Sequence, residues 1–210
     1  MHGITRGLLA TDCEVAAARW VQRKLGDCQH ERRVLAIAAK LFDLTRPLLG
    51  LGLAEHRLLR LSALVHDVGR CINEKDHPTE GAAMVGMTTA IDLSPHDRRA
   101  LAFLTRYHRG AVPAEHAEEH LGPHDHRRSL RSVLALLRSA DALDSRRLAP
   151  PQLILALDGR RLSVQCLVHP TDYRDARGAF DKRKKFGLLG DLLGEAVVVR
   201  IDRAVLPLSA

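Results

Sequence analysis

Apolar residues recur at three- and four-residue spacing through the first 150 residues of this 210-residue chain. This spacing puts apolar side chains on one face of a helix, and it narrows the possible folds more than any other feature. Between about His30 and Leu44, for example, Val34, Ile37 and Leu41 form one stripe. We predict further helices over residues 11–24, 54–68, 95–107 and 129–144, and one beginning near residue 77. Residues 1–150 are therefore expected to form a helical bundle.

Residues with strong preferences for helix ends indicate where these helices begin and stop. Thr11 opens a capping-box pattern at the start of the first helix. Pro95 follows a serine at a helix start, where proline is tolerated because its missing N–H would have no helical partner. We expect Pro47 and Gly50 to end the second helix and Gly69 to stop the third.

The pattern changes after Pro150-Pro151. A short apolar run, an Asp158-Gly159 turn signal and an alternating segment predict a hairpin. The expected strands cover residues 153–157, 162–168 and 196–201, with helical sequence over 172–190. We therefore predict a mostly α protein, with a helical domain over 1–150 and a small α/β appendage over 151–210 that packs on it.

Composition excludes several classes of protein. Aromatic residues make up only 3% of the chain, so platforms for stacking single-stranded nucleic acid are scarce. The four cysteines share no C-x-x-C spacing, which argues against a thiolate zinc site and favours a reduced, cytoplasmic setting. The sequence has no apolar run long enough to cross a membrane, and its first ten residues do not resemble a signal peptide.

The net charge of +7 comes mainly from arginine, since only six of the 32 basic residues are lysine. Arginine forms paired hydrogen bonds with phosphate or carboxylate, so an anionic partner fits this balance. A genome rich in arginine codons would give the same excess, and charge alone does not separate the two.

His66 and Asp67 are adjacent at the expected end of the third helix, which brings an imidazole nitrogen and a carboxylate oxygen within reach of one metal ion. His30 and Asp141 each continue an apolar stripe of another helix. A buried carboxylate without a partner is costly, and one shared metal ion would relieve that cost for Asp67 and Asp141 together. We therefore predict a metal site formed by these four residues.

Two further histidines can extend this site. His77 begins one predicted helix and His108 ends another. Their nitrogens would hold a second metal ion or donate to a phosphate group. Histidine and carboxylate ligands suit divalent Mn, Fe, Co, Ni, Mg or Zn rather than a thiolate-bound ion.

Four segments in order resemble a known family. The order His30, His66-Asp67, Asp141 looks like the HD-domain metal-dependent phosphohydrolases. QHERRVLAIAAKLFD, LSALVHDVGRCIN, FLTRYHRGAVP and LLRSADALD together resemble the C-terminal HD domain of the exopolyphosphatase/guanosine pentaphosphate phosphatase (Ppx/GppA) family. The resemblance covers residues 20–205, and it implies the same helical fold with a small α/β unit at its end. It departs from the family at Arg70, where lysine is frequent, and in lacking the actin-like nucleotide-binding lobes.

The resemblance implies hydrolysis of a phosphomonoester or phosphodiester of nucleotide or polyphosphate type by metal-activated water. Asp67 would be both a metal ligand and the group that orients the nucleophile. Arg70 or Arg109 would assist catalysis by neutralising the equatorial phosphoryl oxygens, and Glu80 is a candidate general base. Four arginines flank the expected site and are candidate phosphate-binding residues, although each also fits an ordinary solvated arginine: Arg70, Arg106, Arg109 and Arg138.

Two other charged segments have simpler interpretations. His116, His120, His124 and His126 lie among acidic residues in a polar segment and are expected to be solvated. The basic run 182–185 is expected to be a solvated helix face, with an anion-binding patch as its functional alternative.

Two classes of function are consistent with these sequence features. The first is a metal-dependent phosphohydrolase acting on a phosphorylated small molecule or polyphosphate. The second is a non-catalytic or regulatory module that binds polyphosphate or a nucleotide, and the intact ligand set favours the enzyme. Nucleic acid and membranes are not expected partners, and a homodimer stays open.

Overall fold

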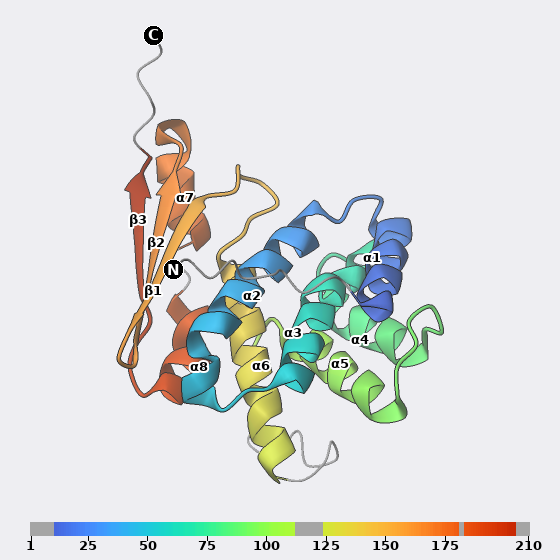
Figure 1. Ribbon diagram of the computed structural model, residues 1–210. Helices are drawn as coiled ribbons and strands as arrows, with labels where there is room; N and C mark the ends of the chain where they lie inside the picture. The colour runs from blue at the N-terminus through green and yellow to red at the C-terminus, as the bar shows by residue number, and fades with distance from the viewer. Residues whose placement is uncertain (1–10, 112–123, 181–182, 205–210) are drawn as a thin grey trace.

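The computed structural model describes residues 11–111, 124–180 and 183–204, and all structural statements below concern these residues. The chain is mostly helical, with a small three-stranded sheet towards its C-terminus, as the sequence predicts. Figure 1 shows the sheet on one side of the molecule and the helices α1 to α6 beside it.

The helical part contains α1 (Asp12–Leu25), α2 (Gln29–Leu49), α3 (Leu53–Val65), the 3₁₀ turn η1 (Val68–Cys71), α4 (His77–Met87), α5 (Pro95–Tyr107) and α6 (His124–Ala142). Thr11 and Ser94 cap α1 and α5, because their hydroxyl groups accept hydrogen bonds from the backbone N–H three residues later. All the predicted helices form, and the differences concern where they begin and end.

Pro47 does not end α2, contrary to the prediction. It lies within the helix, and the chain turns only at Gly50, which has a φ of +67° that favours glycine. A proline so close to the end of a helix removes few hydrogen bonds, so the last turn survives. The sixth helix likewise starts earlier than predicted, at His124.

The third helix ends at Val65, before the predicted Val68, and Gly69 does not stop it. A Cβ atom on Gly69 would lie 2.2 Å from the carbonyl oxygen of His77 and 2.4 Å from the backbone nitrogen of Gly81. Glycine is therefore required because α4 packs directly against η1. This close approach places the start of α4 next to the end of α3.

The sheet is formed by β1 (Gln152–Asp158), β2 (Arg161–Val168) and β3 (Val198–Arg203). β1 and β2 are an antiparallel hairpin, whereas β3 runs parallel to β2. A parallel pair needs a crossover connection, and here it contains α7 (Tyr173–Phe180) and α8 (Arg183–Leu193), preceded by the short turn η3 (Pro170–Asp172). The single helical segment predicted over 172–190 is thus two helices.

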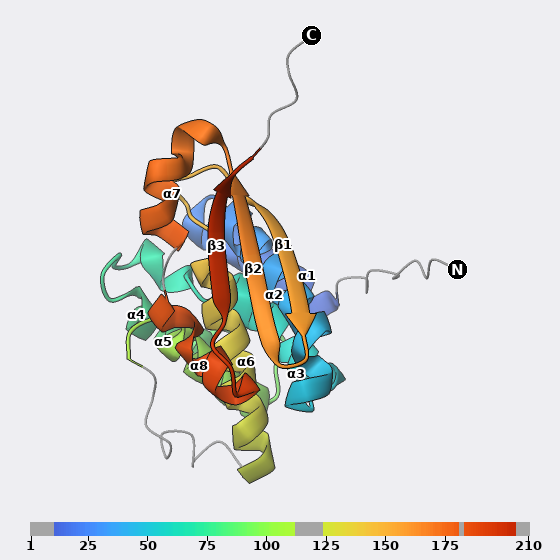
Figure 2. The ribbon, with the colours of Figure 1, turned by 90° about the vertical axis from the view of Figure 1, so that its left-hand side faces the viewer.

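One face of the sheet packs on the helices. Leu162, Val164 and Cys166 of β2 belong to the same buried apolar cluster as side chains of α2, α6 and α8. Figure 2 shows these helices behind the sheet, with α7 near its upper end. Side chains from both sides of Pro150-Pro151 therefore share one core. Among the described residues, no helix is long and apolar enough to cross a membrane.

Candidate metal centre

Ends of five helices bring six of the predicted ligands together. His30 lies in the first turn of α2, His66 and Asp67 follow α3, His77 begins α4, His108 follows α5, and Asp141 lies in the last turn of α6. All six are buried, with at most 9% of each residue exposed.

Three of the four histidines are oriented by backbone carbonyl groups. The Nδ1 atoms of His66, His77 and His108 lie 2.9, 2.8 and 2.7 Å from the carbonyl oxygens of the residues three positions earlier. A carbonyl oxygen only accepts, so each Nδ1 carries the proton and donates it. In the neutral ring, Nε2 then carries a free electron pair and faces the other candidate ligands, as in metal-binding histidines.

Asp67 and Asp141 lie at the centre of these nitrogens. Asp67 Oδ1 is 3.1 Å from His77 Nε2, 3.3 Å from His108 Nε2 and 3.7 Å from His66 Nε2. Asp141 Oδ1 is 3.4 Å from His30 Nε2 and 3.7 Å from His66 Nε2. The residues thus fall into two overlapping groups, His30–His66–Asp141 and His66–Asp67–His108, whose ligand atoms lie within 4.8 Å of one another.

The donor set fits a divalent cation on two observations. Within the described residues, the buried Nε2 atom of His66 has no hydrogen-bond partner. The Nε2 atoms of His77 and His108 lie 3.3 Å apart, although both rings donate through Nδ1 to carbonyl groups. Electron pairs that converge in a buried space are costly unless a cation or protons lie between them. Nitrogen and carboxylate oxygen are ligands that first-row divalent ions prefer.

The ionisation of Asp67, Asp141 and His108 suits metal binding. At His30 and His66 the neighbouring carboxylates outweigh burial and raise the pKa, to about 9 for His30, so these two rings would give up a proton when a cation binds. Burial alone would raise the pKa of Asp67, but His66 and contacts with His108 and His77 hold the pKa well below its usual range. The pKa of Asp141 is held low in the same way, by His30 and His66. Burial lowers the pKa of His108 to about 4, so its imidazole is neutral at physiological pH. The centre therefore presents ionised carboxylates and at least one neutral imidazole.

The family of this chain follows from a match to one family model. The model of the Ppx/GppA phosphatase, domain III, matches residues 17–164. The chain belongs to the Ppx/GppA domain III family. No curated protein matches the chain. The matched residues contain all six candidate ligands of this Ppx/GppA domain, and the match ends within β2, before α7 and α8.

The open side of the centre is a cleft of about 380 Å³. Of the arginines predicted to bind phosphate, the structure places Arg70 and Arg109 on this cleft. The cleft is also lined by residues that sequence reasoning did not single out or did not place at the site: Glu74, Asp144, Ser145, Arg146, Arg147, Gly178, Ala179 and Lys185.

The other predicted residues lie elsewhere in this Ppx/GppA domain. Arg138 is buried and donates to the backbone oxygens of Tyr107 and Gly110, at 2.7 and 2.8 Å, so its guanidinium is used within the fold. Arg106 is exposed and lies over the ring of Tyr107. Glu80 is partly exposed in α4 and is not among the residues that line the cleft.

Besides Arg70, whose Nη1 atom lies 3.5 Å from Asp67 Oδ2, two further cations contact the central carboxylates directly. Arg146 donates to Asp67 Oδ2 at 3.0 Å and also pairs with the buried Glu31. Lys185 of α8 pairs with Asp141. Arg146 carried no signal in the sequence, and Lys185 was expected to be solvated with the rest of the basic run. His116, His120 and Lys182 lie outside the described residues, as do the side chains of His124 and His126.

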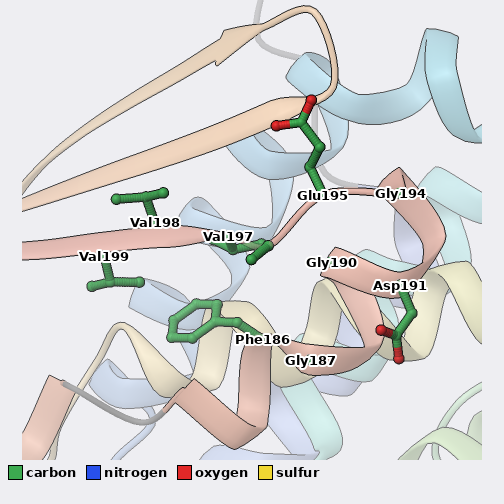
Figure 3. A pocket seen from close by; sticks show the side chains of 10 residues that line it. Phe186, Gly187, Gly190, Asp191, Gly194, Glu195, Val197, Val198 and Val199 are labelled. Atoms are coloured by element: carbon green, nitrogen blue, oxygen red, sulfur yellow. The ribbon is translucent and has the colours of Figure 1, made fainter.

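Another cavity of the described structure lacks this chemistry. One of about 770 Å³ lies between α8 and the beginning of β3, with Phe186 on one side and Val197 and Val199 on the other (Figure 3). None of the six candidate ligands lines it. The cleft is therefore the place in the described structure where metal-ligating side chains and cationic side chains meet.

Proposed function

We propose that the protein is an HD-type, metal-dependent phosphohydrolase that acts on a phosphomonoester or phosphodiester of nucleotide or polyphosphate type. The observation that carries this proposal is the convergence of four imidazole groups and two ionised carboxylates at the base of a cationic cleft. Family membership agrees with it, since the family model is that of a phosphatase domain.

The residues divide into two sets of ligands that share Asp67. His30, His66, Asp67 and Asp141 would hold one divalent ion, and His77 and His108 would hold a second with Asp67. Mn, Fe, Co, Ni, Mg and Zn all fit ligands of this type. When bound, such an ion polarises a phosphoryl oxygen and lowers the pKa of a water molecule towards neutrality.

The chain's own residues bind and orient the phosphoryl group. Arg70 and Arg109 face the cleft, where guanidinium groups pair with phosphate oxygens and neutralise their charge. Arg146 and Lys185 already balance Asp67 and Asp141, which lets two carboxylates stay ionised side by side in a buried site. Asp67 Oδ1 lies nearest the histidine nitrogens and would orient the attacking water.

The same two cations favour a second function. Arg146 pairs with Asp67 and Lys185 pairs with Asp141, so two cations of the chain itself balance the central carboxylates. In that state the cleft is a cationic pocket for phosphate groups. A polyphosphate- or nucleotide-binding module without turnover is therefore the alternative.

Metal content and turnover of the Asp67→Ala variant test the proposal. The wild-type chain, purified without chelator, should contain a first-row divalent ion and hydrolyse at least one substrate of a phosphatase panel. Asp67→Ala should lose both. Asp97→Ala is the matched control, because Asp97 lies on α5 in an ion pair with Arg57 outside the centre. Unchanged metal content in Asp67→Ala would overturn the ligand assignment, and metal binding without turnover would favour the binding module.

Thermal unfolding gives a second readout of the metal. A ligand present at 100 times its Kd stabilises the folded state by about 2.7 kcal/mol. For a chain of this size each kcal/mol corresponds to roughly 2–4 °C, so chelation should lower the Tm of the wild type by roughly 5–10 °C. The Tm of Asp67→Ala should not respond to the chelator.

A further inference from the structure

A second cationic cavity lies beside the metal cleft. It has a volume of about 730 Å³ and is lined mainly by Thr171, Tyr173, Arg174, Arg177, Gly178 and Arg203. These residues come from η3, α7 and the end of β3. All of them follow residue 164, so none belongs to the segment that the family model matches.

The three arginines of this cavity are available to a ligand. Arg174 and Arg177 are exposed, and their three-residue spacing places them on one side of α7. Neither forms an ion pair with any residue that the structure describes. Arg203 is also exposed, and its guanidinium lies 4.8 Å from the ring centre of Tyr173, a cation–π contact that holds it at the cavity.

The carboxylates that the structure describes near these arginines lie outside the cavity. Asp172 accepts a hydrogen bond from the hydroxyl of Thr171 at 3.0 Å, and Asp175 is exposed on α7. Neither lines the cavity. The cavity therefore has the chemistry of a site for a multiply charged anion, since guanidinium groups form paired hydrogen bonds with phosphate oxygens.

Gly178 connects the two cavities. It lines both the metal cleft and the arginine cavity. A Cβ atom built on it would have no neighbouring atom within 4 Å, so the space beside Gly178 is open. A ligand chain could pass over Gly178 with its ends in the two cavities.

We propose that the arginine cavity is a second subsite for the same substrate, and that it binds a phosphate group several bonds away from the one at the metal centre. The substrate class is then an elongated polyanion, such as a linear phosphate chain or the oligophosphate of a nucleotide, rather than a simple monoester. The inference rests on the proposed function, which identifies the metal cleft as the first subsite. The second subsite is defined by Arg174, Arg177 and Arg203 alone.

Binding of inorganic tripolyphosphate tests the second subsite directly. Affinity is measured by calorimetry for the wild type, for Arg174→Gln/Arg177→Gln and for the matched control Arg161→Gln/Arg200→Gln. The control removes the same charge from the outer part of the sheet, where Arg161 and Arg200 line a different cavity. We expect the test variant to bind roughly tenfold more weakly, the scale of losing charge-assisted hydrogen bonds at an exposed site. Equal affinities for the test variant and the control would overturn the proposal.

The same titration in the Asp67→Ala background separates this inference from the proposed function. Tripolyphosphate should still bind there through the arginine cavity, and the double substitution should still weaken it. Loss of all binding in Asp67→Ala would overturn a separate subsite. If the enzyme proposal fails but this arginine-dependent binding persists, the second subsite stands without it.

Substitution of Gly178 tests the connection between the two cavities. Gly178→Leu places a side chain in the open space beside this residue without a clash in the described structure. Because Gly178 lines both cavities, the substitution should weaken tripolyphosphate binding by a larger factor than it raises the KM for p-nitrophenyl phosphate. An equal loss for both probes would overturn the bridging path, because the side chain would then obstruct the metal cleft itself.

A comparison of tripolyphosphate with ATP distinguishes the two sources of an elongated phosphate. If both ligands lose affinity equally in Arg174→Gln/Arg177→Gln, the subsite recognises the phosphate chain. A larger loss for ATP would support a nucleotide and indicate contacts beyond its phosphates. Unchanged affinity for both would overturn the proposal.

Discussion

His30 Nδ1 lies 2.6 Å from Asp144 Oδ2, and this contact determines which nitrogen of His30 faces the metal centre. Arg33 donates to the same carboxylate from its Nε atom at 2.7 Å, so Asp144 is itself held in place. The other three histidines of the centre are oriented by backbone carbonyls, and His30 is the one that depends on a side chain. Asp144 is thus a positioning residue.

We predict that Asp144→Asn weakens metal binding by about 10- to 100-fold, the usual effect of losing a carboxylate partner of a ligating histidine. The amide keeps the size of the side chain but removes its charge, so the fold should remain. Metal titration of the chelated protein measures the change, and circular dichroism checks the fold. Wild-type metal affinity in Asp144→Asn would show that His30 is oriented by other contacts.

Helical periodicity selected four of the six candidate ligands, because His30, His66, His108 and Asp141 each lie where an apolar stripe reaches the end of a helix. Asp67 was selected because it is adjacent to His66, and His77 because it begins a helix. His30 and Asp141 were found because they continue such stripes, and burial confirms that position. No such pattern marked Arg146 and Lys185, the two cations of the cleft that the sequence analysis did not place there. Arg146 follows the end of α6, and Lys185 reaches Asp141 only because α8 packs against α6. Contacts of this kind depend on the crossover between β2 and β3, which periodicity does not describe.

The role of Gly69 is a second feature that sequence periodicity did not reveal, because it concerns the packing of backbone against backbone. A glycine after a helix usually indicates a helix stop, but here it allows α4 to approach η1. We predict that Gly69→Ala destabilises the fold by about 1–3 kcal/mol, the usual cost of overpacking. Because the clash involves the carbonyl oxygen of His77, metal binding should also weaken.

Denaturant unfolding and metal titration of Gly69→Ala measure both effects. Gly86→Ala is the control, because it lies in α4 and its Cβ atom would have open space around it. That variant should be as stable as the wild type or more stable by up to about 1 kcal/mol, since alanine favours a helix over glycine. Similar stability of the two variants would contradict the packing role of Gly69.

His56 lies outside the metal centre and makes the stability of the fold depend on pH in the acid range. It is buried and stacked on Phe42, with ring centres 4.6 Å apart, and burial together with the nearby Arg60 lowers its pKa. The unfolded state therefore binds more protons than the folded state below the usual pKa of histidine, about 6.5. Its contribution to stability is present above that pH and is lost as the pH falls.

We predict that His56→Leu reduces the loss of unfolding free energy between about pH 7.5 and about pH 5.5, relative to the chelated wild type. Denaturant titrations at the two pH values give the comparison. His169→Leu, at an exposed position before η3, controls for removing a histidine as such. If the unfolding free energy of His56→Leu and of the wild type falls by the same amount over this range, His56 is not the source of the pH dependence.

Lys185 competes with a metal ion for Asp141, because its ammonium group pairs with that carboxylate. We predict that Lys185→Met raises metal affinity roughly three- to tenfold, since removing a nearby cation relieves repulsion of about 1 kcal/mol in a partly screened site. The same substitution should raise the KM for a phosphorylated substrate, because the cleft loses one positive charge. Lys184→Met is the matched control, because Lys184 is the residue next to Lys185 and its side chain is exposed. Metal titration and steady-state kinetics would measure the two effects, and equal metal affinity in the two variants would mean that Lys185 leaves Asp141 without competing when the ion binds.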